Sequence, residues 1–281
     1  MERIKVITDS AADLPEDVVK DLGIAVIPLI AIFGERAYED PALSRDEFWR
    51  LARDVGAPKT SQPPPGTFRE VFKRWVDEGY RVLCATVTGQ HSGTFNTASS
   101  VAQAFGDRVT VVDSRSVSLG MGWQVIEAAK MALQGATMEK ILESLRSLRE
   151  RTHIIIQLDT VEYLRRGGRA AKLMPAIDRL LQALQLKPLV TLVEGELKLL
   201  GVARSYQKGV RRIQEELARL CPLERVAVMH TRREAFARQL ADDLAGLTGI
   251  AREQIFIGEP GAVISCHAGE GIIAAVGVTA R

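Results

Sequence analysis

Short runs of β-branched and other apolar residues alternate with helical patterns through the first half of the chain, and this order constrains the fold more than any other feature. Strands are predicted at 3–8, 24–33, 81–87 and 109–113. Helices are predicted at 13–23, 44–55, 67–77, 94–105, 118–134 and 138–151. Strands that alternate with helices favour a parallel sheet covered on both faces, with right-handed crossover connections. We therefore expect an N-terminal parallel-sheet α/β domain over residues 1–152.

The pattern changes after residue 152, where closely spaced strands replace the regular alternation. Two extended runs, 187–193 and 197–203, flank Glu194-Gly195-Glu196 and predict a β-hairpin. Further strands are predicted at 153–158, 226–230, 254–258 and 272–278, and helices at 160–166, 172–184, 205–220 and 234–246. Hairpins mixed with helices favour an α+β domain with a mixed sheet over residues 153–281. The expected fold class is therefore α/β, with two domains that share a cleft.

Composition and charge exclude several classes of protein. The chain of 281 residues is 46% hydrophobic and has a formal net charge of +2, so it can bury a core and is not a disordered chain. The longest apolar stretch, 24–33, is shorter than the roughly 20 residues of a membrane helix and contains Pro28. No stable membrane insertion is expected. The charge excess is too small to favour nucleic acid, which requires a dense basic face.

The cysteine content and the first residues indicate a reducing compartment. The three cysteines, Cys84, Cys221 and Cys266, show no CxxC spacing and give neither a disulfide framework nor a zinc site. Cys84 lies in an apolar run and is expected in the core. Because Met1-Glu2-Arg3 leads directly into a strand, we expect no signal peptide and a cytoplasmic location.

Motifs for common cofactors are missing from the sequence. There is no GxxxxGK[ST] loop, no GxGxxG after the first strand, no HExxH and no GxSxG elbow. We therefore expect no standard nucleotide site, no metal site and no other cofactor.

Polar residues gather where the predicted strands end, which is where open α/β sheets bind ligands. Thr8-Asp9-Ser10 follows the first strand and either lines the cleft or forms the turn into the next helix. Thr60 and Ser61 precede a proline run that can hold two hydroxyl donors for an anion at little entropic cost. The same proline run also fits a stiffened connection.

A third polar loop, 88–94, lies between a predicted strand and a predicted helix. Gly93 lets a ligand approach the backbone, and the free N–H groups at a helix start attract negative charge. Ser92 adds a hydroxyl group. Ser92-Gly93-Thr94 therefore suits an anion-binding site, although such a sequence is also an ordinary helix cap.

Two further positions carry groups that interact with anions. The segment Tyr163–Arg169 places three guanidinium groups beside Gly167-Gly168, and arginine matches carboxylate or phosphate oxygens with two hydrogen bonds. A solvated charge run is the alternative for Arg165 or Arg166. His267 lies in the segment 265–271, which is predicted to be a glycine-rich turn, and a histidine there can pair with an anion or transfer a proton.

These residues, taken in order, resemble the DegV family. The matching motifs run from end to end of the chain: Thr8-Asp9-Ser10 with Asp13-Leu14, Pro58-Lys59-Thr60-Ser61-Gln62-Pro63, Ser92-Gly93-Thr94, Val112-Asp113-Ser114, Tyr163-Leu164 with Gly167-Gly168-Arg169, and His267. The resemblance implies a bacterial fatty-acid-binding protein of the FakB type, with one long-chain fatty acid held between the two domains. It implies no activity of its own. A separate ATP-dependent fatty acid kinase would phosphorylate the acyl carboxylate, and the acyl phosphate would enter phospholipid synthesis.

The resemblance also implies roles for individual residues. The carboxylate would be bound by Thr60, Ser61, Ser92, Gly93, Thr94 and His267. Arg169 and His267 would serve phosphoryl transfer or the docking of the kinase. The chain departs from the family pattern after His267, where Ala268-Gly269-Glu270-Gly271 stands in place of Gly-Pro-Gly and adds a carboxylate.

Two other functions remain open from the sequence. A serine hydrolase would use Ser92 as nucleophile and His267 as base, oriented by Asp9 or Asp113, and would need a hydroxyl–imidazole contact of about 2.6–3.2 Å. A regulatory protein that senses lipid would share the ligand and lack the kinase partner.

Overall fold

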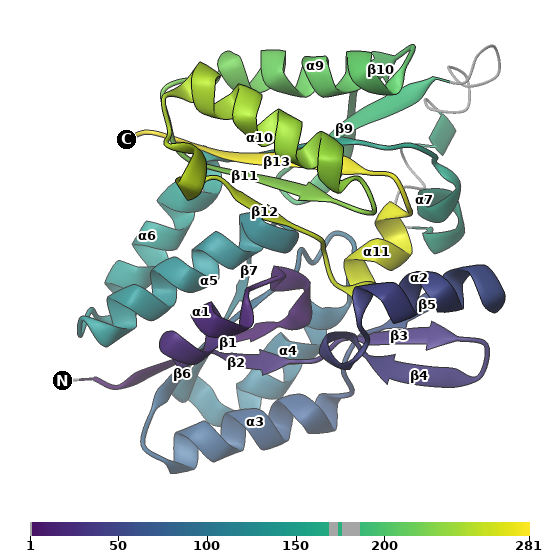
Figure 1. Ribbon diagram of the computed structural model, residues 1–281. Helices are drawn as coiled ribbons and strands as arrows, with labels where there is room; N and C mark the ends of the chain where they lie inside the picture. The colour runs from purple at the N-terminus through teal and green to yellow at the C-terminus, as the bar shows by residue number, and fades with distance from the viewer. Residues whose placement is uncertain (1, 169–173, 176–185) are drawn as a thin grey trace. The chain divides into compact units, whose positions relative to one another are not determined.

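The computed structural model describes residues 2–168, 174–175 and 186–281 (Figure 1). These residues form two compact units. The N-terminal unit comprises Met1–Glu150 together with the short segment Gly261–Val263, and the C-terminal unit comprises Arg151–Pro260 with Ile264–Arg281. The sequence patterns did not predict that Gly261–Val263 groups with the first unit.

The N-terminal unit is built on a four-stranded parallel sheet. Its strands are β1 (Ile4–Asp9), β2 (Ala25–Ile27), β6 (Arg81–Thr86) and β7 (Val109–Asp113), in the order β2-β1-β6-β7. All three neighbouring pairs run parallel, as predicted. The carboxyl ends of β1, β6 and β7 therefore lie along one edge of the sheet.

Helices cover both faces of this sheet. The helices of this unit are α1 (Glu16–Asp21), α2 (Arg45–Asp54), α3 (Pro65–Asp77), α4 (Thr94–Ala102), α5 (Ser118–Leu133) and α6 (Met138–Arg151), with 3₁₀ turns η1 (Ser10–Ala12), η2 (Asp40–Ala42) and η3 (Gln103–Arg108). Of these, α3, α4 and α5 pack on the parallel sheet. Phe68 and Phe72 of α3 pack with Cys84 in the core, so the prediction for Cys84 is confirmed. In Figure 1, α5 lies across the sheet from α3 and α4.

The apolar run 24–33, predicted as one extended segment, is divided between two sheets. Pro28 lies between β2 and β3 (Ile30–Phe33) and lacks the N–H that a strand interior requires. Strand β3 pairs antiparallel with β4 (Arg36–Glu39) and with β5 (Lys59–Ser61) in a small separate sheet. The sequence predicts no strand at β5, because its polar residues give no strand pattern.

The C-terminal unit contains the predicted mixed sheet. Its strands are β8 (Thr152–Gln157), β9 (Lys187–Val193), β10 (Glu196–Ala203), β11 (Leu223–His230), β12 (Phe256–Gly258) and β13 (Ile273–Thr279), in the order β10-β9-β8-β13-β11-β12. The pair β11 and β12 is parallel, and the other pairs are antiparallel. Strands β9 and β10 form the predicted hairpin.

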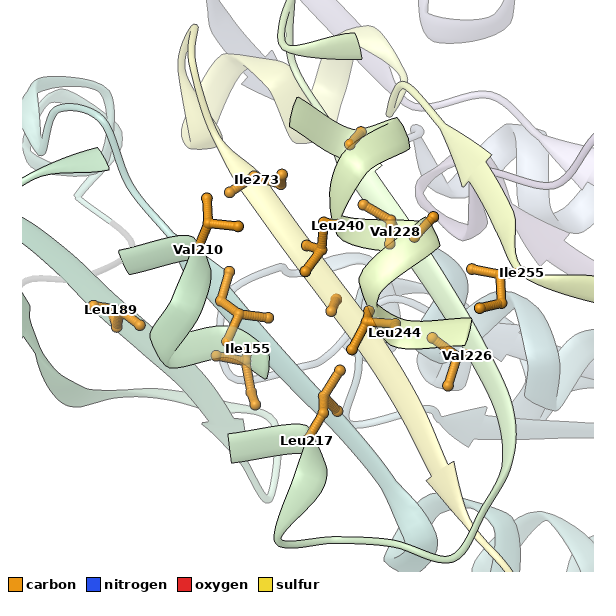
Figure 2. Packing of buried hydrophobic residues seen from close by; sticks show 14 of the residues in the cluster. Ile155, Leu189, Val210, Leu217, Val226, Val228, Leu240, Leu244, Ile255 and Ile273 are labelled. Carbon is orange, nitrogen blue, oxygen red and sulfur yellow. The ribbon is translucent and has the colours of Figure 1, made fainter. Parts of the chain in front are cut away.

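Helices α9 (Tyr206–Ala218) and α10 (Glu234–Thr248) pack on this sheet. Figure 2 shows their side chains meeting those of the strands, among them Val210, Leu217, Leu240 and Leu244 from the helices and Ile155, Val226, Val228 and Ile273 from the sheet. Ser205 begins α9 as predicted, because its hydroxyl accepts a hydrogen bond of 3.3 Å from the Lys208 N–H. The helix predicted at 172–184 lies outside the described residues, apart from 174–175.

Short helical segments among the described residues of this part of the chain include α7 (Glu162–Gly167), the 3₁₀ turn η4 (Arg252–Gln254) and α11 (Ala262–Ala268). His267 lies in α11, so the prediction of a turn over 265–271 is wrong for its first half. The sequence between Gly261 and Gly269 contains no helix-breaking residue, and the turn follows at Gly269 and Gly271, both with positive φ. Among the described helices, none has both the length and the apolar character needed to cross a bilayer.

Candidate functional site

Asp9 connects the ends of β1 and β6 in the N-terminal unit. One carboxylate oxygen accepts a hydrogen bond of 3.0 Å from the Ala11 N–H, and the other accepts one of 2.8 Å from the Val87 N–H. The side chain is 1% exposed, and desolvation raises its pKa to about 7 despite these two bonds. Asp9 therefore begins the 3₁₀ turn η1, which supports the helix-entrance interpretation of Thr8-Asp9-Ser10.

Asp113 plays a similar part at the end of β7. Its carboxylate accepts hydrogen bonds from the N–H groups of Gly89, at 3.2 Å, and Arg115, at 2.8 Å. The loop after β6 is held to the loop after β7 a second time, because the Thr88 N–H donates to the Ser116 carbonyl at 3.0 Å. The backbone that leads to Ser92 is thus fixed by the edge of the sheet.

Ser92, Gly93 and Thr94 form the start of α4. The Ser92 hydroxyl oxygen accepts a hydrogen bond of 3.2 Å from the Thr94 N–H and lies 2.8 Å from the Thr94 hydroxyl oxygen. Thr94 is fully buried, and Gly93 is exposed. The first turn of α4 contains no acidic side chain, so no carboxylate of its own compensates the positive end of the helix dipole.

Gln62 brings the two predicted hydroxyl loops together. Its side-chain amide donates a hydrogen bond of 2.7 Å to the Thr97 hydroxyl on α4. Its amide oxygen lies so close to Gly93 that any β-carbon at residue 93 would overlap it. Glycine at residue 93 therefore leaves room for the Gln62 side chain to lie against the backbone. The sequence motif contained Gln62, but residue patterns alone assigned it no role.

Thr60 and Ser61 lie on β5, beside this contact. Thr60 is half-buried and pairs with Ala31 of β3. Ser61 is exposed, and its hydroxyl donates to the Gln62 carbonyl at 3.1 Å. Because successive residues of a strand point to opposite sides, Thr60 and Ser61 present their hydroxyls in opposite directions. Gln62 is therefore the residue of this segment that contacts the start of α4, at Gly93 and Thr97.

His267 belongs to the C-terminal unit, where it lies against α7. A β-carbon at Gly167 would be 2.5 Å from His267 Nδ1, and one at Gly269 would be 2.6 Å from the Tyr163 ring. The imidazole is half-buried. Arg169 lies outside the described residues. Within the described ranges, no group of three or more His, Cys, Asp or Glu side chains is arranged to hold a metal ion.

A cavity of about 560 Å³ in the N-terminal unit lies beside β1 and α1. Its lining combines buried acids with basic and apolar side chains, including Lys5, Asp13, Val19, Asp40, Arg45 and Trp75. The residues predicted to bind a carboxylate are not among those that line it.

The chain is similar to known proteins over nearly its whole length. A family model described as "Uncharacterised protein, DegV family" matches residues 3–280. A DegV domain-containing protein of Caldanaerobacter subterraneus subsp. tengcongensis is 34% identical over 276 residues, which cover 96% of each chain.

Solved structures agree with this match. A DegV family protein from Thermus thermophilus, whose structure concerns fatty acid binding, gives a TM-score of 0.90 at 32% identity and covers 99% of this chain and 100% of its own. The fatty acid binding protein DegV from Bacillus subtilis gives a TM-score of 0.88 at 26% identity, with both chains covered completely. The chain described by this sequence therefore belongs to the DegV family.

Proposed function

We propose that this protein binds a long-chain fatty acid and presents its carboxylate to a separate ATP-dependent fatty acid kinase, as proteins of the FakB type do. The observation that carries the proposal is the contact of Gln62 with Gly93 and Thr97, which joins two loops of hydroxyl groups at the start of α4. The likeness to the Thermus thermophilus protein, whose structure concerns fatty acid binding, supports the choice of ligand.

The chemistry of the cluster suits an acyl carboxylate. The Thr60, Ser61 and Ser92 hydroxyls and the N–H groups of Gly93 and Thr94 are the proposed donors, and the helix start has no acidic residue to repel an anion. The Ser61 hydroxyl and the Thr94 N–H donate to the Gln62 carbonyl and to the Ser92 hydroxyl oxygen without ligand, so the proposal requires both to exchange these partners for the carboxylate. A carboxylate removed from water without such partners would be strongly destabilised. Each methylene of the acyl chain that leaves water contributes about 0.8 kcal/mol, so the tail supplies most of the affinity and the cluster fixes its polar end.

The proposed reaction takes place with the kinase and not within this chain alone. A carboxylate oxygen attacks the γ-phosphorus of ATP, the bond to the bridging oxygen of ADP breaks, and acyl phosphate and ADP result. Two cationic or proton-carrying side chains, Arg169 and His267, are proposed to neutralise the transferred phosphoryl group or to contact the kinase. His267 is also proposed to bind the carboxylate.

Organic extraction of protein purified from a bacterial host, followed by mass spectrometry, tests the ligand. A long-chain fatty acid at close to one molecule per chain is the expected result. The methyl ester of the same acid should compete at least tenfold less well, since it lacks the anionic end. Protein that neither carries nor takes up fatty acid would exclude the proposal. Binding without any stimulation of a fatty acid kinase would instead indicate a lipid sensor.

A further inference from the structure

The segment Gly261–Val263 is held by two buried carboxylates of the N-terminal unit. The Gly261 N–H donates to a carboxylate oxygen of Asp13 at 2.7 Å, and the Val263 N–H donates to one of Asp40 at 3.0 Å. These three residues group with the N-terminal unit, although the chain before and after them belongs to the C-terminal unit. The two acids are thus the hydrogen-bond partners of this three-residue segment.

Gly261 fits between the two carboxylates only because it has no side chain. A β-carbon there would lie 2.8 Å from one oxygen of Asp40 and 3.2 Å from the bonded oxygen of Asp13. The backbone of Gly261 does not have a positive φ. The reason for glycine is therefore the close approach of the acids and not the backbone conformation.

Both acids occupy unfavourable positions to make these bonds. Asp40 is 2% exposed. Asp13 has a φ of 49°, and its second carboxylate oxygen is shielded from solvent beside the Ser118 hydroxyl. Burial raises the pKa of Asp13 to about 7 and also raises the pKa of Asp40, while the nearby Arg45 acts in the opposite direction on both. Neutral polar side chains would cost less free energy to bury. Packing alone would therefore not require two carboxylates at these positions.

We infer that Asp13 and Asp40 are positioning residues that hold the first turn of α11 and thereby set the place of His267. Val263 and His267 lie on the same short helix, Ala262–Ala268. At its other end, His267 packs against Gly167. A displacement at Gly261 and Val263 is therefore transmitted along one turn of helix to the imidazole. The functional part of this inference rests on the proposed role of His267 in phosphoryl transfer.

The test compares Asp13→Ala and Asp40→Ala with Asp13→Asn in the full-length protein. Asparagine keeps an oxygen that can accept the Gly261 N–H, and its amide NH₂ group can donate to the Ser118 hydroxyl oxygen beside the second carboxylate oxygen. Both alanine variants should increase hydrogen exchange of the 261–268 segment at least tenfold and shift the His267 Cε1–H signal in the NMR spectrum. Asp13→Asn should restore both to the values of the natural protein. Asp77→Ala, which removes an exposed carboxylate paired with Lys73, is the control for loss of charge.

A second variant changes the glycine, and not the acids, in the contact of Gly261 with Asp13 and Asp40. Gly261→Ala introduces a methyl group between the two carboxylates and should give the same exchange and NMR changes with both acids intact. This variant keeps the inference testable if an alanine variant does not fold. Unchanged exchange and an unchanged His267 signal in Gly261→Ala and in the folded alanine variants would overturn the inference.

The same proteins separate this inference from the proposed function. Hydrogen exchange and the His267 signal are measured without ligand or kinase. If the natural protein takes up no fatty acid, the proposed function fails, and the exchange results still decide whether Asp13 and Asp40 hold α11. If it does take up fatty acid, the alanine variants should lose at least tenfold in kinase-dependent phosphorylation measured at saturating fatty acid.

Discussion

The side-chain amide of Gln62 donates a hydrogen bond of 2.7 Å to the hydroxyl of Thr97, a residue 35 positions further along the chain. This bond ties the end of β5 to the first turns of α4. The amide oxygen of the same Gln62 side chain lies against Gly93, and a β-carbon at residue 93 would overlap it. One amide side chain and one glycine thus connect the strand that carries Ser61 to the helix that begins after Ser92.

Gly93→Ala should weaken fatty acid binding about fivefold, because the new methyl group displaces Gln62 and breaks its hydrogen bond to Thr97. That value corresponds to the loss of roughly 1 kcal/mol, typical of one hydrogen bond. Displacement of a fluorescent fatty acid measures the affinity. In a Gln62→Ala background the same substitution should have little further effect. Independent, additive losses would show that Gly93 acts without Gln62.

Ser92→Ala should lower the affinity for a fatty acid by about 10–100-fold, since a hydrogen bond to a charged group contributes about 1.5–3 kcal/mol. Titration calorimetry with the free acid measures the loss. The methyl ester of the acid should bind the natural protein and the variant equally. Ser100→Ala, at an exposed position of the same helix, is the matched control. Equal losses for acid and ester would mean that Ser92 does not contact the carboxylate.

The free energy of unfolding should decrease as pH rises from about 4 to about 7. Desolvation raises the pKa of both Asp9 and Asp13 to about 7 in the folded protein, against about 3.9 in an unfolded chain. Between these values the folded protein holds more protons than the unfolded one, and stability is therefore lost with increasing pH. Thermal unfolding across this pH range measures the slope. The contribution of Asp13 is on the order of a few kcal/mol, so Asp13→Asn should flatten the slope and raise Tm at pH 8.

Asp9 provides the contrast to Asp13 in that experiment. Both carboxylate oxygens of Asp9 accept hydrogen bonds from backbone N–H groups. In the Asp9→Asn variant, the side-chain NH₂ group would therefore face one of these N–H donors. This variant should lower Tm at every pH, although it too removes a buried charge. A stabilising Asp9→Asn would contradict the assignment of both oxygens as acceptors.

Gly167→Ala should displace His267, because a β-carbon at residue 167 would lie 2.5 Å from its Nδ1 atom. Kinase-dependent phosphorylation at saturating fatty acid is expected to fall at least tenfold, and the affinity for fatty acid should also fall, because His267 is proposed to bind the carboxylate as well. Gly246→Ala, in α10 with open space around it, is the control for adding a methyl group. Normal phosphorylation by the Gly167 variant would remove His267 from the proposed reaction.

Gln157→Met should raise the stability of the protein. Gln157 is fully buried in β8, and neither atom of its side-chain amide has a hydrogen-bond partner. Its amide oxygen lies against Gly209 of α9. A buried, unsatisfied polar group costs about 1–3 kcal/mol, and methionine has a similar shape. Denaturant unfolding measures the change, with the exposed Gln134→Met as control. A loss of stability would indicate that an ordered water binds Gln157.

Local signals in the sequence were sufficient for most of the regular structure. Ser44 and Ser205 start their helices with side-chain hydrogen bonds, as their positions predicted. The apolar run at 109–113 forms β7 within its predicted bounds. The polar strand β5 and the helix that carries His267 were missed. Strand β5 exists because β3 offers it a free edge, and helix α11 is too short to produce a periodic pattern.

The sequence by itself determined the order of strands and helices, the parallel and mixed sheets, and the motifs that identify the family, because hydrophobic periodicity and helix caps act over a few residues. Only the tertiary structure decided that Gln62 closes over Gly93 and that Asp13 and Asp40 hold the backbone at Gly261. These contacts join residues far apart in the chain. Their strength comes from burial and from the lack of room for a β-carbon, and neither can be inferred from residues that are adjacent in the sequence.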